Sequence, residues 1–139
     1  MAGIGDVRVA EAASRTPFDK DTFAKYLRDH AGPPYGHGKC ATFIREAMEA
    51  AGLDTRHHPV HAKDYGAFLQ SRMFTVVPPA GYLPQTGDIV VIQSIAHHPS
   101  GHIQGWEGTQ WMSDFKQPHF YPAHAYERAS AAYVIYRRL

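Results

Sequence analysis

The stretch Gly38-Lys39-Cys40-Ala41-Thr42-Phe43-Ile44 takes the chain from a loop of small residues into a helix. From there, apolar residues recur at helical spacing and predict a stripe along one face: Cys40, Ile44, Ala47 and Ala51. Gly52 predicts the C-terminal end of this helix. The only cysteine of the chain therefore stands at a predicted helix N-terminus, where free N–H groups and the helix dipole favour an anion.

On either side of this helix, the hydrophobic period changes along the chain. Helical spacing predicts two more helices, at residues 17–30 and 61–69, the first with Thr16 as its N-cap and Pro17 at its first position. Apolar runs predict five strands, at residues 73–77, 88–93, 102–106, 111–115 and 133–137. Helices followed by a strand meander predict an α+β domain, with N-terminal helices packed on an antiparallel sheet. We expect a single domain over residues 1–139, with residues 1–15 as a loose N-terminal arm.

Composition argues against several classes of function. Lys and Arg total 14 against 13 Asp and Glu, without a basic run, so we expect no nucleic-acid partner. No apolar run reaches the length of a membrane span, so we expect no membrane insertion. Residues 1–6 lack the charged and apolar regions of a signal peptide. We expect synthesis in the cytoplasm, and export by some other machinery if the protein acts elsewhere.

Cys40 is the candidate nucleophile. A single cysteine cannot form an internal disulfide, nor build a thiolate zinc cage. A helix N-terminus and a nearby imidazolium lower the pKa of a thiol, and this predicts an activated thiolate at Cys40. The N–H of Cys40 itself could hold the oxyanion of a tetrahedral intermediate. The alternative is a small buried residue of the apolar stripe, which is a common place for a free cysteine.

His102 and Asp114 could complete a catalytic site. His102 begins a predicted strand directly after Gly101, where its ring could turn toward a facing helix. Asp114 follows twelve residues later, across the predicted hairpin turn at 107–110, and the even spacing suggests that both side chains share one face. A carboxylate there could orient the imidazole. The alternative is an exposed histidine, one of ten, and a solvent-facing aspartate.

Cys40, the Gly101-His102 step and Asp114 together resemble the papain-like peptidoglycan amidases of the NlpC/P60 group. The segment Thr86-Gly87-Asp88-Ile89-Val90 is similar to the strand that precedes the histidine strand in that group. Two features depart from it. Much of the group has histidine where this chain has Asp114, and Lys39-Cys40-Ala41 replaces a common Asp-Cys-Ser. Together with the small size and the absent signal, the motifs look most like the amidase effectors of bacterial type VI secretion.

The resemblance implies a papain-like NlpC/P60 fold and an enzyme that cuts an amide in the stem peptide or cross-bridge of peptidoglycan. Cys40 would attack, His102 would move the proton and Asp114 would orient His102, without a cofactor or metal. Tyr35, Lys39 and Ser113 are weaker candidates for oxyanion or substrate contacts. An effector of this kind implies a cognate immunity protein, a component of the secretion apparatus as a partner, and action in the periplasm of a target bacterium.

Three other interpretations remain open. A phage endolysin or a housekeeping wall amidase would share the same Cys-His-Asp site. An inactive wall-binding module could stack sugars on aromatic side chains, although these could equally form the core: Trp106, Trp111, Phe120 and Tyr121. Ten histidines suggest zinc, but no predicted helix carries the paired histidines and glutamate of a zinc peptidase.

Overall fold

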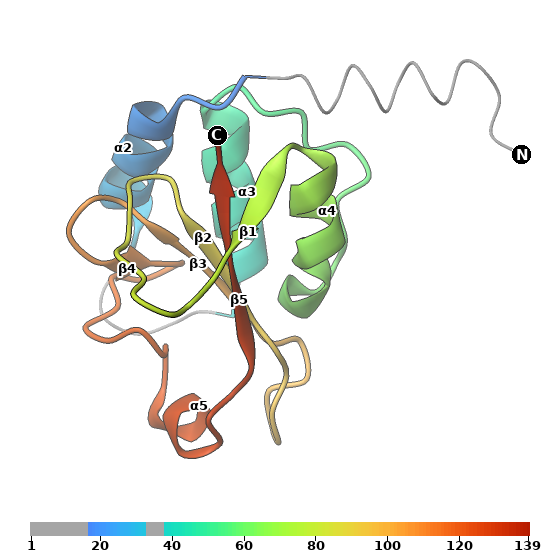
Figure 1. The fold of residues 1–139 in the computed structure, drawn as a ribbon, viewed down its shortest axis with the longest axis vertical. Helices are drawn as coiled ribbons and strands as arrows, with labels where there is room; N and C mark the ends of the chain where they lie inside the picture. Colours follow the sequence, from blue (N-terminus) through green and yellow to red (C-terminus); the bar gives the residue numbers. More distant parts are fainter. Residues whose placement is uncertain (1–16, 33–37) are drawn as a thin grey trace, which may run out of the picture.

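The computed structural model describes residues 17–32 and 38–139. The helical elements are α2 (Lys20–His30), α3 (Cys40–Ala50), the 3₁₀ turn η1 (Ala62–Asp64), α4 (Tyr65–Ser71) and α5 (His124–Arg128). The strands are β1 (Phe74–Val77), β2 (Ile89–Ile92), β3 (His102–Trp106), β4 (Trp111–Met112) and β5 (Tyr133–Arg138) (Figure 1). The α+β class is confirmed, with most helices ahead of the strands. The predicted N-terminal arm, residues 1–15, lies outside the described residues.

The five strands form one antiparallel sheet in the order β1-β5-β2-β3-β4. The middle strand, β2, is buried along its whole length, as its continuous apolar run predicts. In its ladder with β3, Ile89 pairs with Gly105 and Ile92 pairs with His102. His102 therefore lies at one end of the sheet, and the start of β2 lies at the other.

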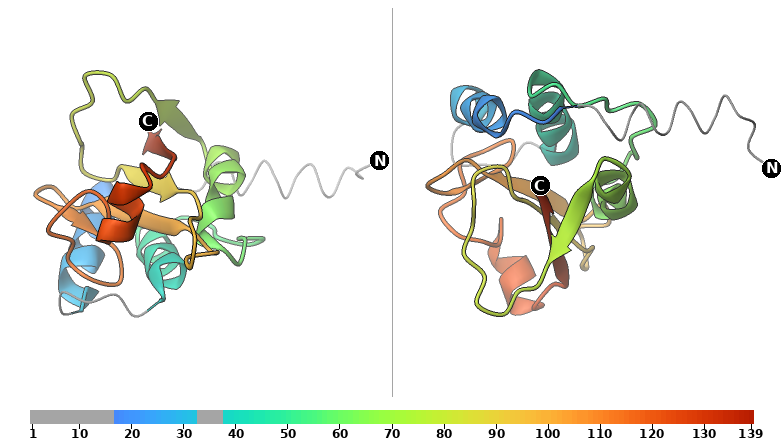
Figure 2. Two further views of the ribbon diagram at one scale, coloured as in Figure 1. Left: turned by 90° about the horizontal axis from the view of Figure 1, so that it is seen from below. Right: turned by 45° about the horizontal axis from the view of Figure 1, so that its top comes forward.

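One face of the sheet is covered by α2 and α3, which lie side by side against it (Figure 2). Gly105 makes the close approach of α2 possible, because a Cβ there would come within 2.8 Å of the Phe23 ring. The opposite face carries a second apolar cluster that includes Val90, Ile92 and Trp111. Among the aromatic residues considered for sugar stacking, Trp111 is only 6% exposed, and Trp106 packs edge-on against it at 5.1 Å. Trp111 belongs to this second cluster, and the partly buried Trp106, Phe120 and Tyr121 pack against it.

Two helix ends show how the sequence sets the element boundaries. The cap of α2 is Asp19, whose carboxylate accepts the N–H groups of Asp21 and Thr22 at 3.1 Å. The prediction of Pro17 at the first helical position is therefore wrong, and Thr16 lies outside the described residues. The end of α3 is as predicted. Gly52 takes a φ of 95°, and its N–H bonds to the carbonyl of Glu49.

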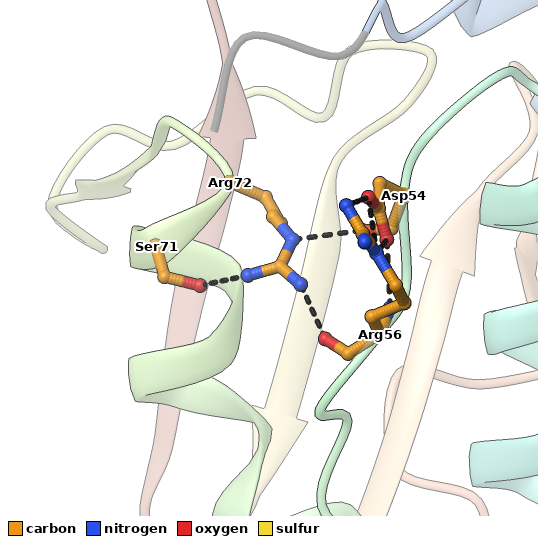
Figure 3. A network of polar contacts seen from close by, with 4 residues as sticks. All are labelled: Asp54, Arg56, Ser71 and Arg72. Carbon is orange, nitrogen blue, oxygen red and sulfur yellow. Dashed lines mark hydrogen bonds and ion pairs between the residues drawn. The ribbon is translucent and has the colours of Figure 1, made fainter. Parts of the chain in front are cut away.

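The loop between α3 and α4 is fixed by a buried arginine (Figure 3). Arg72, at the end of α4, donates to the carbonyl of Asp54 at 2.7 Å and to the carbonyl of Arg56. It also donates to the Ser71 hydroxyl at 2.7 Å, and its guanidinium lies 4.6 Å from the centre of the Phe68 ring. Arg72 thereby ties the end of α4 to the loop that follows α3.

Two sequence predictions need correction. The strand expected at 111–115 stops at Met112, because the chain turns back there and Gln117 donates its N–H to the Trp111 carbonyl at 2.9 Å. The short helix α5 was not predicted, because its five residues are too few to show a period. Within the described ranges, no helix is both long and apolar enough to cross a bilayer.

Candidate active site

Cys40 and His102 open onto one cavity. Cys40 is the first residue of α3 and His102 the first of β3, two elements that pack against each other. The cavity has a volume of about 440 Å³. Asp114 and Tyr126 also line it, as do residues 97–101. The structure thus brings together the three residues that the sequence singled out: Cys40, His102 and Asp114.

Gly101 explains why a glycine precedes the histidine. It adopts a φ of 67°, a conformation that side chains rarely take. A Cβ at this position would lie 2.4 Å from the carbonyl oxygen of Ile92 and 2.9 Å from Cβ of Lys63. The turn into β3 therefore needs glycine, and this turn delivers the His102 side chain to the cavity.

Asp114 reaches the cavity by a different route from the one expected. In the β3–β4 ladder Gly105 pairs with Met112, so a continued hairpin would place Asp114 opposite Ile103 and on the other face from His102. The chain instead leaves the strand after Met112. The carbonyl of Asp114 accepts the N–H of Gly32 at 3.0 Å, and its carboxylate accepts the N–H of Lys39 at 3.1 Å. These bonds hold Asp114 beside the start of α3.

The expected activation of the thiol by the helix N-terminus is outweighed by burial. Burial raises the pKa of Cys40, and the negative charge of Asp114 raises it further. The N–H groups of Ile103, Ala41 and Cys40 act in the opposite direction and favour the thiolate. The prediction of a lowered thiol pKa is therefore wrong, because desolvation is the larger effect.

The His102 ring is buried, with 6% of the residue exposed. Burial lowers the pKa of His102 to about 4, while the contact with Gln117 and the charge of Asp114 oppose this shift. The resting pair at neutral pH is therefore a thiol and a neutral imidazole. The ring atom Nε2 lies 2.8 Å from Oε1 of Gln117.

Sequence reasoning missed Gln117 and Tyr126. Gln117 lies in the segment after β4, where no periodic pattern marks a structural role. Tyr126 lies on α5, and the centre of its ring is 6.3 Å from that of His102. Tyr126 lines the cavity, and burial raises the pKa of its hydroxyl to about 12. The argument that selected Asp114, an even separation from His102 across the hairpin turn, selects neither Gln117 nor Tyr126.

The weaker candidates occupy different places. Tyr35 lies outside the described residues. Lys39 lines a second cavity of about 370 Å³, which Asp114 and Glu46 also line. Ser113 is fully buried and lines neither of these two cavities. We therefore do not carry Ser113 into the proposed substrate contacts. Among the described residues, no three His, Cys, Asp or Glu side chains gather as a metal site would require.

No family model and no curated protein matches the chain. Two solved structures are similar to it, both of the type VI effector–immunity complex Tae3–Tai3 from Ralstonia pickettii. The native complex matches with 36% identity and a TM-score of 0.80, over 88% of this chain and 100% of the other. The selenomethionine form matches with 38% identity and a TM-score of 0.76, over 83% and 98%.

This similarity over essentially the whole matched chain places the protein in the class of type VI effectors. It belongs to the Tae3 family.

Proposed function

We propose that the protein is a cysteine amidase that cuts an amide bond in the stem peptide or cross-bridge of peptidoglycan. One observation carries the proposal. A helix-start cysteine, a strand-start histidine and an aspartate line one cavity in a chain of the Tae3 family. The NlpC/P60 resemblance of the same three positions supports a papain-like reaction.

In the proposed reaction, the sulfur of Cys40 attacks the amide carbonyl while neutral His102 takes the thiol proton. The N–H groups at the start of α3, including that of Cys40, lie where they could hold the oxyanion. The C–N bond then breaks, and His102 gives its proton to the leaving amine. Water, activated by His102, hydrolyses the thioester and releases a carboxylate and the free thiol.

Asp114 contributes charge to this cycle. Its carboxylate raises the pKa of His102 and so favours the imidazolium that forms during attack. It also fixes the entry to α3 through the N–H of Lys39. Because Asp114 lines both cavities, a branched peptide could extend on either side of Cys40. Lys39 and Glu46, on the second cavity, offer one positive and one negative side chain to such a substrate.

The proposal extends to delivery and partners. The solved relatives are effector–immunity complexes, so we propose that this chain also has a cognate immunity protein. As a type VI effector it would be handed to a component of the secretion apparatus and would act in the periplasm of a target bacterium. An endolysin or housekeeping amidase would share the site but is not favoured by the relatives.

The test is compartment-dependent toxicity in a Gram-negative host. The protein should lyse cells when it is fused to a periplasmic signal peptide and should be harmless in the cytoplasm. Cys40→Ala should abolish the lysis at equal protein level. Toxicity confined to the cytoplasmic protein would contradict a wall substrate. Lysis that persists in Cys40→Ala would indicate a binding module instead of an enzyme.

A further inference from the structure

The His102 ring is held by a series of hydrogen bonds through two buried glutamines. Its Nε2 lies 2.8 Å from Oε1 of Gln117, and Nε2 of Gln117 donates to Oε1 of Gln104 at 2.8 Å. Gln117 is 1% exposed and Gln104 is fully buried. Hydrogen bonds between buried groups are stronger than on the surface, so these two glutamines constrain the ring.

Two main-chain carbonyls decide which way the Gln117 amide faces. Its Nε2 also donates to the carbonyl of Phe120 at 3.2 Å and to that of His119 at 3.3 Å. A carbonyl can only accept, so the amino side of the amide must face these groups and the oxygen must face His102. The amide oxygen of Gln117 can only accept a hydrogen bond, so the ring nitrogen facing it must donate an N–H. Nε2 of His102 therefore carries the proton, and in the neutral ring Nδ1 is the basic nitrogen.

We infer that Gln117 is the positioning residue for His102, holding Nε2–H and leaving Nδ1 as the base. The inference rests on the proposed function, in which His102 takes the thiol proton. It divides between two residues the role that the sequence assigned to Asp114 alone. Gln117 sets the tautomer and the orientation of the ring, and Asp114 supplies charge.

Gln104 carries a buried donor without a partner in the described part of the chain, and this supports a functional reason for having a glutamine at this position. Nε2 of Gln104 is buried and has no hydrogen-bond partner among the described residues. A buried donor without a partner lowers stability, so folding alone would favour an apolar side chain at this position. The oxygen of Gln104 gives a reason to keep the amide, because it accepts from Gln117 and helps to fix its orientation.

The direct test is the protonation of the two ring nitrogens, measured by ¹⁵N–¹H NMR on the Cys40→Ala protein. This measurement needs no enzymatic activity. Above the pKa of the ring, His102 should show only the Nε2–H tautomer. Adding Gln117→Met should give a mixture of tautomers. Adding Gln110→Met is the matched control, because Gln110 donates at 2.9 Å to the main-chain carbonyl of Gln117 and does not touch its amide.

Kinetics supply the second readout. In the active protein, Gln117→Met should lower kcat by about 10- to 100-fold with little change in KM. Gln110→Met should leave kcat near the wild-type value. Gln104→Met should keep or raise the melting temperature and lower kcat less than Gln117→Met.

Failure of the inference and failure of the proposed function are distinguishable. An Nδ1–H tautomer in the Cys40→Ala protein overturns the role of Gln117 even if the protein digests peptidoglycan. The same holds if Gln117→Met changes neither the tautomer nor kcat. If Gln117→Met does not fold, the tautomer of the Cys40→Ala protein still decides. A Cys40→Ala protein that digests peptidoglycan overturns the proposed function and leaves the NMR result intact.

Discussion

At Cys40, opposing influences act on one sulfur atom. Burial and the charge of Asp114 favour the thiol, whereas the N–H groups at the start of α3 and the N–H of Ile103 favour the thiolate. Burial also keeps His102 neutral, with a pKa of about 4. The site is thus prepared to move a proton during attack, and it does not rest as an ion pair.

The pH dependence of kcat/KM and of thiol alkylation should show that Cys40 and His102 are both neutral at rest. The neutral imidazole is the base, so kcat/KM should hold on the acid side until the pH falls to about 4, far below the usual range of histidine. The rate of Cys40 alkylation by iodoacetamide should keep increasing as the pH rises into the alkaline range, because the thiol pKa is raised. An alkylation rate that is already maximal at pH 6, or an acid limb near pH 6.5, would contradict this account.

Asp114→Asn should have opposite effects on reactivity and on turnover. The amide oxygen can still accept the Lys39 N–H, but the charge is lost. Without that charge the thiol pKa falls, so alkylation at neutral pH should speed up. The imidazolium loses its stabilising charge, so kcat should fall by about tenfold or more. Unchanged kcat, with an unchanged alkylation rate, would remove Asp114 from the mechanism.

Among the secondary-structure elements, the turn into β3 matters most for the site. Gly101 makes this turn, and the backbone of Ile92 and the side chain of Lys63 leave no room for a Cβ. The Gly-His pair in the sequence is therefore a structural requirement joined to a chemical one. A shift of this turn would move the His102 ring directly.

Gly101→Ala should destabilise the fold and lower activity together. Gly81→Ala is the matched control, because Gly81 has a φ of 68° but no atom within 4 Å of an added Cβ. The control should cost about 1 kcal/mol for the backbone conformation alone. Gly101→Ala should cost about 1–3 kcal/mol more, since the backbone of β2 must shift. Denaturant unfolding would measure both, and equal losses would contradict the packing argument.

At the scale of the whole molecule, the end of the sheet farthest from the site is held by a buried aspartate. Asp88 precedes β2 and accepts two bonds from Arg137, at 2.8 and 2.9 Å, and one from the Tyr82 hydroxyl at 2.6 Å. This cluster ties the loop before β2 to the last strand. It explains the acid of the Gly87-Asp88 pair as structural, because β2 separates Asp88 from His102.

Asp88→Asn should reduce the free energy of unfolding by about 2–4 kcal/mol, because it removes the charge facing a partly buried arginine. The folded variant should keep its kcat. Asp29→Asn is the control, since Asp29 pairs with Lys25 on the exposed side of α2, and it should melt like the wild type. A normally stable Asp88→Asn protein without activity would make Asp88 part of the site.

The sequence predicted the parts of the molecule in which a period or a special residue is visible. These are the stripe of α3, the apolar run of β2 and the Gly101-His102 step. It failed where long-range contacts decide the path. The chain leaves β4 after two residues because the turn docks on Gly32, and this brings Asp114 and Gln117 to the site. No local pattern encodes that docking, so the role of Gln117 could not be predicted from the sequence.

The central claim is hydrolysis of a peptidoglycan amide by Cys40, and digestion of purified sacculi with mass analysis of the fragments tests it most directly. The wild type should release fragments that differ from the intact muropeptides by one water per cut, at a single kind of amide bond in the stem or cross-bridge. Cys40→Ala, folded to the same melting temperature within a degree or so, should release none. Equal fragments from both proteins, or none from the wild type, would contradict the account.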